Sequence, residues 1–297
     1  MQISFLKHRK IYFIFSGILI ITSLFCLIVF GLKPGIDFTG GSILELEYKT
    51  ERPANQAIKD ILSELNLEEL YVQPSGEQGI ILRMKDIPED LHQEIIQKLG
   101  EGREIEELRF DSIGPAIGQE LKSKTIVVVF ISLLAIVLYI ALAFRKLTFP
   151  AKSWQYGLSS LVALSHDVLI PLGVFSILGK LFGTQITIPV IVALLTVLGY
   201  SINNTVVIFD RIRENLLKKV GSNFEETVDR SLNQTLTRSL NTSLTTLFVL
   251  LAIFFFGGET LRYFSLALIL GIVAGTYSSI FLVSPILATW LKWRKKI

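Results

Sequence analysis

The sequence contains six continuous apolar stretches, each long enough to cross a membrane as a helix. A transmembrane helix needs about 20 apolar residues, because the hydrocarbon core is about 30 Å thick and a helix rises about 1.5 Å per residue. The stretches are continuous rather than alternating, which excludes a transmembrane β-barrel. They cover residues 11–32, 125–144, 158–178, 186–209, 238–256 and 263–291. We therefore predict an α-helical membrane protein with six transmembrane helices.

Basic residues beside these stretches predict the orientation of the chain. Three short segments carry Lys and Arg without any Asp or Glu, and all three fall on one side if every stretch crosses once. Cytoplasmic segments are enriched in Lys and Arg, so we expect both termini in the cytoplasm. The three groups are Lys7, Arg9 and Lys10; Arg145, Lys146 and Lys152; and Lys292, Arg294, Lys295 and Lys296.

The first stretch has some features of a signal peptide. Its apolar run is longer than the core of a signal peptide, and no small-residue cleavage pattern follows it. We expect it to remain as the first transmembrane helix.

The segment 33–124 falls on the outer side in this topology. It holds 11 Lys and Arg against 19 Asp and Glu, which suits a translocated domain. Alternating and helical apolar patterns predict strands at 42–48, 69–73, 79–84 and 104–112, with helices at 54–65 and 88–99. The order β-α-β-β-α-β predicts an α+β ferredoxin-like extracytoplasmic domain. That fold serves many functions and does not decide one.

The remaining boundaries follow from these elements. Residues 1–32 form the cytoplasmic N-terminus and first span, 125–209 the second to fourth spans, and 238–297 the last two spans with the cytoplasmic C-terminus. Between them, 210–237 mixes apolar and charged residues at helical spacing. We expect this amphipathic segment to lie along the cytoplasmic membrane surface.

Two charged or titratable residues lie near the middle of the third span. His166 and Asp167 are adjacent there, and a charged side chain in hydrocarbon costs about 2.5–3.5 kcal/mol on insertion scales. Asp167 either exchanges protons or caps a neighbouring polar group and holds helices together.

Other polar residues mark the fourth and fifth spans. Asn203 and Asn204 lie inside the fourth span, whereas Asp210, Arg211 and Arg213 are expected at the solvated interface. A stripe at i, i+3, i+4 and i+7 should face protein or water rather than lipid, although its arginine has the alternative of reaching the interface. The stripe consists of Arg238, Asn241, Thr242 and Thr245. In the sixth span, Gly271 and Gly275 permit close helix packing.

No pattern in the sequence indicates an enzyme, a cofactor or a metal. The single cysteine, Cys26, and three histidines offer no metal-ligand cluster. Nucleophile-elbow, zinc-protease and phosphate-loop motifs are all missing from the sequence. Any energy for transport is therefore expected from an ion gradient acting on charges within the membrane.

Six sequence motifs, in order along the chain, resemble those of the SecF family. They are GIDFTGG (35–41), IGPAIGQEL (113–121), SHDV (165–168), LGYSINNTVVIFDRIREN (198–215), LTRSLNTSLTT (236–246) and FFGG (255–258). The fourth is the most specific. The motif residues carried over are Gly35, Asp37, Gly40, Gly41, Gly114, Pro115, Gly118, Gly199, Asp210, Arg211 and Arg213.

The resemblance implies a function in protein export. SecF is the membrane partner of SecD and looks like half of a transporter of the resistance–nodulation–division type. The pair is thought to use the proton-motive force, or sodium in some sources, to help move exported preproteins across the bacterial plasma (inner) membrane. Implied partners are SecD, the SecY/SecE/SecG channel, and YajC or YidC, with no nucleic acid. Coupling candidates are His166, Asp167, Asn203, Asn204 and Arg238.

One position departs from the family pattern. Asn204 stands where the family usually has an Asp implicated in proton transfer, and an amide cannot release a proton. Coupling then relies on Asp167 and a SecD carboxylate, or the substitution was introduced, or the coupling differs. Two other functions stay open: a translocon scaffold without coupling, and a half-transporter of the same superfamily that exports lipids or small molecules.

Overall fold

A computed structural model describes residues 3–145 and 152–294, in two compact units. One unit comprises Lys33–Val128 and Gly183–Ile188, and the other comprises Met1–Leu32, Val129–Phe182 and Pro189–Ile297. Three basic residues used for orientation, Lys146, Lys295 and Lys296, lie outside the described residues.

The described residues include six helices that are long and apolar enough to cross a membrane. They correspond in order to the six predicted spans, and most extend beyond them because the polar flanks are helical too. They cover Leu6–Phe30, Pro115–Ala143, Ser153–Phe182, Ile188–Leu217, Phe224–Phe256 and Leu261–Trp293. The predicted α-helical membrane architecture is confirmed.

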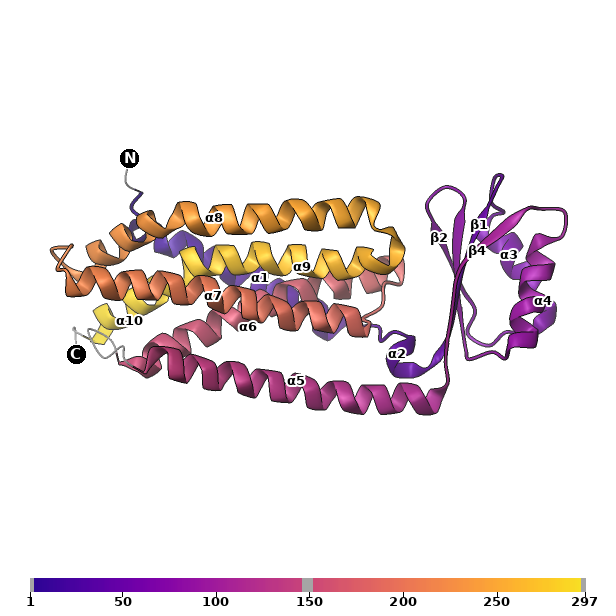
Figure 1. The fold of residues 1–297 in the computed structure, drawn as a ribbon, viewed down its shortest axis with the longest axis horizontal. Coiled ribbons are helices and arrows are strands. Elements are labelled where there is room, and N and C mark those ends of the chain that lie inside the picture. The colour runs from indigo at the N-terminus through magenta and orange to yellow at the C-terminus, as the bar shows by residue number, and fades with distance from the viewer. Residues whose placement is uncertain (1–2, 146–151, 295–297) are drawn as a thin grey trace. The chain divides into compact units, whose positions relative to one another are not determined.

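The helical elements are labelled in Figure 1. A short helix, Leu6–His8, leads into α1 (Arg9–Phe30); α2 (Ile36–Thr39) follows it, and the long helices are α5 (Pro115–Phe144), α6 (Ser153–Phe182), α7 (Ile188–Leu217) and α8 (Phe224–Phe256). The last span has three parts: α9 (Gly258–Ser278), a π-helical turn (Ser279–Val283) and α10 (Ser284–Arg294). The sequence pattern predicted one uninterrupted helix here.

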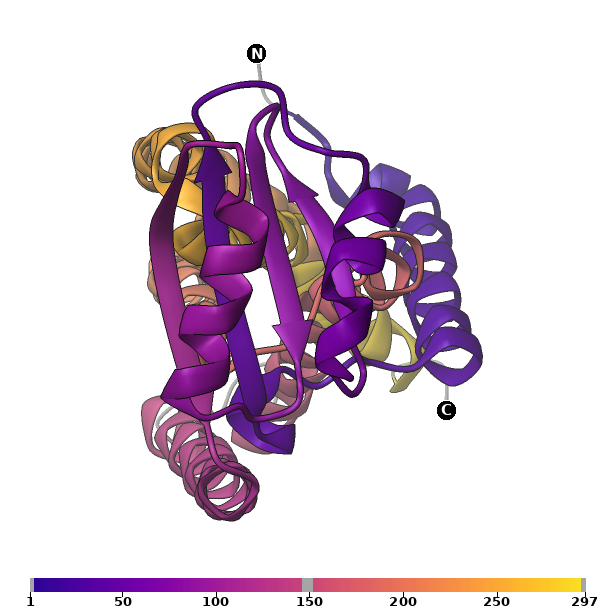
Figure 2. The same cartoon turned by 90° about the vertical axis from the view of Figure 1, so that its right-hand side faces the viewer.

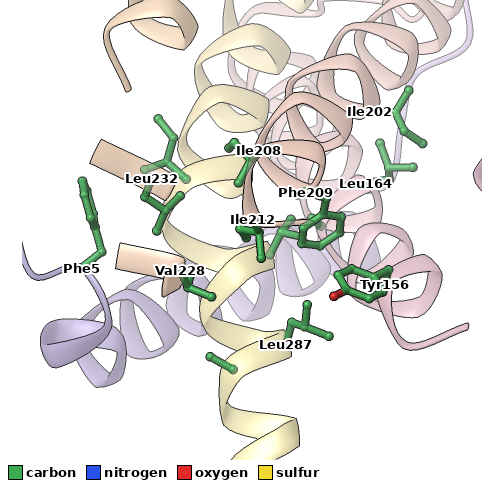
Figure 3. Close-up of a cluster of buried hydrophobic side chains, with 14 of the residues drawn as sticks. Phe5, Tyr156, Leu164, Ile202, Ile208, Phe209, Ile212, Val228, Leu232 and Leu287 are labelled. Carbon is green, nitrogen blue, oxygen red and sulfur yellow. The ribbon is translucent and has the colours of Figure 1, made fainter. Parts of the chain in front are cut away.

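The amphipathic segment 210–237 does not form a separate surface helix, contrary to our expectation. Its first part is the end of α7 and its second part is the start of α8, with a turn between them (Figure 1). Asn215 donates hydrogen bonds to Ser231 at 2.8 Å and to Gln234 at 2.7 Å across the hairpin. Most of its apolar positions pack into the bundle core with residues of α6 and α10, as Figure 3 shows for Ile212, Val228, Leu232, Tyr156 and Leu287, whereas Leu217 is exposed.

Small residues allow two close helix contacts within the bundle. A Cβ atom added at Gly173 of α6 would lie 2.6 Å from the side chain of Ser23 in α1. Added at Gly271 of α9, it would lie 2.2 Å from the side chain of Val197 in α7. The predicted close packing at this glycine therefore occurs within the chain itself rather than against a partner.

The other unit contains a four-stranded antiparallel sheet in the order β2-β3-β1-β4. The strands are β1 (Gly41–Tyr48), β2 (Tyr71–Ser75), β3 (Gly79–Met84) and β4 (Ile105–Ile113). Helices α3 (Asn55–Leu62, extended by a 3-10 turn, Ser63–Leu65) and α4 (Glu89–Gly100) cover one face (Figure 2). This is the predicted ferredoxin-like arrangement.

The apolar alternation of the sequence explains which face the helices cover. Leu44, Leu46 and Tyr48 of β1 point into the core with Ile58 of α3 and Ile95 of α4, all at 0% exposure. Strand β2 begins and ends two residues later than predicted, at Tyr71 and Ser75, so that part of the expected turn belongs to the ladder.

Both edges of the sheet are irregular. Edge strand β2 contains Pro74, which has no backbone N–H. Edge strand β4 has a register shift opposite Glu45 and Leu46 of β1, and the skipped residue is Leu108.

Candidate functional site

Asp167 is the centre of a fully buried polar cluster in the helical unit. Its side chain is 0% exposed, and its Oδ2 accepts hydrogen bonds from Ser201 at 2.5 Å and from Ser278 at 2.8 Å. Nδ1 of His166 lies 2.9 Å from Oδ1. The carboxylate thus joins α6, which carries it, to α7 and α9.

The helix packing around Asp167 depends on a glycine. A Cβ atom at Gly275 would lie 3.0 Å from Cβ of Ser201 and 3.5 Å from Oδ2 of Asp167. Gly275 therefore lets α9 approach α7 closely enough for hydroxyl groups from both helices to reach one carboxylate oxygen. The π-helical turn begins directly after Ser278, and such turns often occur at functional sites.

The imidazole of His166 extends the cluster toward α1. Its Nε2 is buried with no hydrogen-bond partner, and its ring lies 5.9 Å from the ring of Tyr277 at an interplanar angle of 23°. The Tyr277 hydroxyl donates to the Tyr12 carbonyl at 3.2 Å and lies 3.3 Å from the Ser16 hydroxyl. A series of polar groups therefore leads from Asp167 to α1, with one gap at Nε2 of His166.

Asn204 lies one helical turn beyond Ser201 on α7. It is 5% exposed and its Nδ2 has no hydrogen-bond partner. Its neighbour Thr205 is also buried, and the Thr205 hydroxyl lies 3.3 Å from that of Ser279. An unpaired buried amide is costly, and Asn204 is thus the least satisfied polar residue on this part of α7.

The other predicted residues of α7 point outward. Asn203, Gly199 and Asp210 are exposed. Asp210 lies 3.8 Å from Arg213, and Arg211 pairs with Glu214 at 2.5 Å, near the end of the helix. These three charged residues stabilise the end of α7 and do not reach Asp167.

Arg238 and its stripe on α8 are exposed. Arg238, Asn241, Thr242 and Thr245 all face away from the bundle core. Among the described residues, no hydrogen bond or ion pair joins the Arg238 side chain to His166, Asp167 or Asn204. Arg238 and Asn204 are both coupling candidates, and within this chain the two do not meet.

The glycine-containing motifs at 35–41 and 113–121 form a second, interlocked cluster in the sheet-containing unit. The segment before β1 pairs with residues 183–188: Gly35 N–H donates to the Ile186 carbonyl at 2.8 Å, and Ile186 N–H donates to the Lys33 carbonyl at 2.7 Å. Asp37 Oδ2 accepts from the backbone N–H of Ile188, the first residue of α7, at 2.8 Å.

Glycines make this interlocking possible. Gly40 has φ +74°, and a Cβ atom there would lie 2.8 Å from Cα of Pro115. A Cβ atom at Gly118 would lie 2.6 Å from the backbone nitrogen of Gly40. Gly41 and Gly114 flank the same contact, at the start of β1 and just before α5. The motifs at 35–41 and 113–121 are therefore two sides of one close contact.

Sequence reasoning missed Ser201, Ser278 and Tyr277. Ser201 and Ser278 are hydroxyl residues within apolar stretches, which was an available signal, but the helix that each one faces was not apparent. Within residues 3–145 and 152–294, no group of three or more His, Cys, Asp and Glu side chains is placed to hold a metal ion.

The sequence matches known protein families over most of its length. A family model described as protein export membrane protein SecD/SecF, C-terminal, matches residues 92–293, and one described as SecD/SecF GG motif matches residues 27–51. A protein translocase subunit SecF from Thermobaculum terrenum is 42% identical over 97% of this chain and 94% of its own length. The chain belongs to the SecF family.

Other SecF proteins and solved structures agree with this assignment. The SecF of Vibrio alginolyticus is 38% identical over 96% of this chain and 88% of its own length. The crystal structure of SecDF, a translocon-associated membrane protein from Thermus thermophilus, superposes with a TM-score of 0.84 at 33% identity, covering 98% of this chain and 39% of that one. A SecDF structure in a super-membrane-facing form gives 0.69 at 33% identity, covering 100% and 40%. This SecF chain therefore spans about two fifths of the length of those SecDF chains.

Proposed function

We propose that this SecF chain works with SecD to couple the proton-motive force, or a sodium gradient, to protein translocation across the bacterial plasma membrane. The observation that carries the proposal is the buried carboxylate of Asp167, held by hydroxyl groups from two other helices. The chain itself performs no enzymatic step in this proposal. Exported preproteins emerging from the SecY/SecE/SecG channel are the cargo, with YajC or YidC as further partners.

The chemistry of the cluster suits a proton-dependent switch. An ionised Asp167 accepts hydrogen bonds only, and the hydroxyl groups of Ser201 and Ser278 supply two donors to one oxygen. A protonated Asp167 is a weaker acceptor, so both hydrogen bonds from these hydroxyl groups lose strength, and a proton on Oδ2 itself also forces one hydroxyl group to re-pair. Because the hydroxyl groups belong to α7 and α9, gain or loss of one proton changes the strength of the contacts that hold three helices together.

Outward-facing polar groups support a partner helix bundle in the membrane. Asn203 on α7 and Arg238 and Asn241 on α8 are exposed. Threonines of the same stripe are satisfied by their own helix, since Thr242 donates to the Arg238 carbonyl at 3.0 Å and Thr245 to the Asn241 carbonyl at 2.9 Å. The arginine and asparagine side chains are not satisfied by their own helix in this way, and placing them against lipid costs free energy. SecD is the proposed partner for this face.

Asn204 favours a second function in which this chain is a scaffold without coupling of its own. Its amide is buried in the position where the family pattern has the titrating carboxylate. Asn204→Asp restores a titratable carboxylate at this buried position, which Arg238, exposed on α8, does not contact within this chain.

Translocation into inverted membrane vesicles, with SecD present and with or without an uncoupler, tests both functions. We expect Asp167→Asn to remove the uncoupler-sensitive part of translocation, while Thr196→Ala, at an exposed position on α7 whose hydroxyl donates to its own helix, leaves it unchanged. Asn204→Asp should raise the uncoupler-sensitive part of translocation. A normal uncoupler response in Asp167→Asn, together with no gain in Asn204→Asp, favours the scaffold.

A further inference from the structure

A buried histidine of the sheet-containing unit has no role in the proposed function. This residue, His92 of α4, is 3% exposed, and its imidazole lies flat on the ring of Phe110 in β4, with the ring centroids 3.8 Å apart and the planes at 4°. Its Nδ1 lies 3.0 Å from Oε1 of Glu89, and its Nε2 lies 3.3 Å from Oε2 of Glu107. Two carboxylates and an aromatic face therefore surround one imidazole.

The bulge in β4 places two of these residues on the side of the sheet that the helices cover. Glu107 and Phe110 are three residues apart, so in a regular strand their side chains would point to opposite faces. The register shift skips Leu108, and as a result Glu107 is opposite Leu46 of β1. Phe110 is opposite Leu44. Both leucines point into the core under the helices, so the bulge re-aims one side chain and builds the site.

Other charged residues of the elements around His92 are turned away from it or have other partners. Those of β4 lie on the opposite face of the sheet, those of α3 and α4 are exposed or form the pair between Glu64 and Lys98, and Asp86 before α4 accepts from Ser112 at 2.5 Å. Burial raises the pKa of Tyr48, on the covered face of β1, so its hydroxyl stays neutral. Among the described residues of these elements, Glu89 and Glu107 are the charged groups placed against the imidazole. The residues turned away or paired are Glu106, Arg109 and Asp111 of β4, Lys59, Asp60 and Glu64 of α3 and its 3-10 turn, and Asp90, Glu94 and Lys98 of α4.

The protonation state of His92 decides how many of its contacts are favourable. A neutral imidazole has one N–H donor and one acceptor nitrogen, whereas the protonated ring has two donors. Hydrogen bonds from Gln93 and His92 lower the pKa of Glu89, as expected if Nδ1 carries the N–H of the neutral ring. Nε2 is buried without a hydrogen-bond partner in this state, and its lone pair faces the Glu107 carboxylate. A proton on Nε2 turns this contact into a charge-assisted hydrogen bond.

We propose that His92 is a proton-binding site that fastens α4 to β4. The neutral ring is bonded only within α4, to Glu89, whereas the protonated ring bridges Glu89 of the helix and Glu107 of the edge strand. The positive ring is also attracted to the face of Phe110. β4 continues through Gly114 into α5, so the proton strengthens the attachment of the strand that leads into a transmembrane helix.

The use of this bridge in export rests on the proposed function. In the proposed topology the sheet-containing unit lies on the outer side, which the proton-motive force makes proton-rich. The bridge at His92 then forms when the gradient is established and opens when it collapses.

Nuclear magnetic resonance of the full chain in lipid nanodiscs, with isotope-labelled histidine, tests whether His92 binds a proton. The sequence contains three histidines, His8, His92 and His166, so His92→Gln assigns the signals of His92 by their loss. We expect its second ring nitrogen to become protonated between about pH 8 and about pH 5.5, either side of the usual histidine range. A ring that keeps one protonation state throughout this interval overturns the proposal.

Hydrogen exchange of the same preparation, followed by mass spectrometry, measures how firmly α4 is held. After correction for the intrinsic effect of pH on exchange, we expect amide protection of Glu89–Gly100 to rise about fivefold over the same interval, as for one added hydrogen bond. Carboxylates stay ionised in this range. Glu107→Gln should remove the rise. Glu106→Gln, one residue earlier on the opposite face of the same strand, is the matched control and should keep it.

An equal rise in Glu107→Gln and in the natural chain overturns the proposal, because the proton then acts at another group. An unchanged protection of α4 in the natural chain overturns it as well. Neither measurement involves translocation, so a failure here leaves the proposed function standing. A failure of the uncoupler experiments likewise leaves the proton bridge at His92 standing.

Discussion

The carboxylate of Asp37 accepts a hydrogen bond from the backbone N–H of Ile188, the residue that begins α7, across 151 positions of sequence. The first N–H groups of a helix have no partner within the helix, so Asp37 acts like an N-cap residue although it lies in a distant segment. The same segment pairs with residues 183–188 through backbone hydrogen bonds. Asp37 therefore fixes where the helix that carries Ser201 and Asn204 starts.

Removing this cap should destabilise the protein. We expect Asp37→Ala to lower the free energy of unfolding by about 0.5–2 kcal/mol, the usual value of an N-cap, and Asp37→Asn to cost less because its amide oxygen can still accept. Thermal unfolding of the purified chain measures both. Glu77→Ala, in the exposed turn between β2 and β3, is the control and should have little effect.

Two glycines of the helical unit should respond in opposite ways to alanine. Gly271→Ala puts a methyl group 2.2 Å from Val197, so it should destabilise the chain by about 1–3 kcal/mol through overpacking. Gly199→Ala meets no atom within 4 Å, and should stabilise α7 by up to about 1 kcal/mol. Denaturant titration of both variants checks the signs, and a similar response from the two would contradict the packing of α9 on α7.

The hydroxyl groups around Asp167 should act together. Ser201→Ala and Ser278→Ala each remove one donor from the buried carboxylate, at an expected cost of about 1.5–3 kcal/mol for a hydrogen bond to a charged group. Because both bind the same oxygen, the double variant should differ from the sum of the single ones. A double-mutant cycle in the free energy of unfolding measures this, with the uncoupler-sensitive translocation of each variant recorded beside it. Strict additivity would show that the two hydroxyl groups do not share a functional carboxylate.

Cysteine labelling in intact cells checks the proposed topology. Cys26 is buried, which keeps the background low. Glu77→Cys in the sheet-containing unit should label from outside. Gly221 is a poor position for the other probe, because a Cβ atom there would lie 2.5 Å from the Thr227 hydroxyl, whereas Lys218 is exposed. We expect Lys218→Cys to label only after the cells are opened, and labelling of both from outside rules out the proposed arrangement.

The sheet-containing unit should lose part of its stability in acid. A hydrogen bond from Lys98 lowers the pKa of Glu64 from 4.5. The pair therefore stabilises the fold fully above the normal pKa, and this contribution is lost as the pH falls from there through the lowered pKa. Lys98→Gln should reduce the drop in melting temperature on acidification, and Lys59→Gln, on an exposed lysine of α3, should not.

The long apolar stretches and the α+β pattern were sufficient to predict the six helices and the order of the strands. Both signals are local and repeat over many residues. Only part of the cluster at Asp167 could be predicted from the sequence. Ser201 and Ser278 become its partners through the packing of three helices that are distant in sequence. The spacing of apolar residues does not indicate the π-helical turn after Ser278. It also does not indicate that residues 183–188 belong to the sheet-containing unit.

The amphipathic segment shows a different limit. Its apolar face over residues 210–237 was read as a membrane-surface helix, since Leu216, Val228 and Leu232 alternate with charges at helical spacing. The same pattern serves a helical hairpin whose apolar faces pack on each other and on α10. Periodicity identifies the buried face but not what covers it.

The irregular edges of the sheet bear on how this chain meets unfolded polypeptides. An extended peptide binds a sheet by adding a strand to a regular row of unpaired backbone groups, and both rows are interrupted here, by Pro74 in β2 and by the bulge at Leu108 in β4. If the chain works beside unfolded preproteins, as we propose, these interrupted edges keep it from becoming a template for their aggregation. In such a function, the sheet-containing unit contacts a preprotein through side chains. Release then requires no row of backbone hydrogen bonds to be broken.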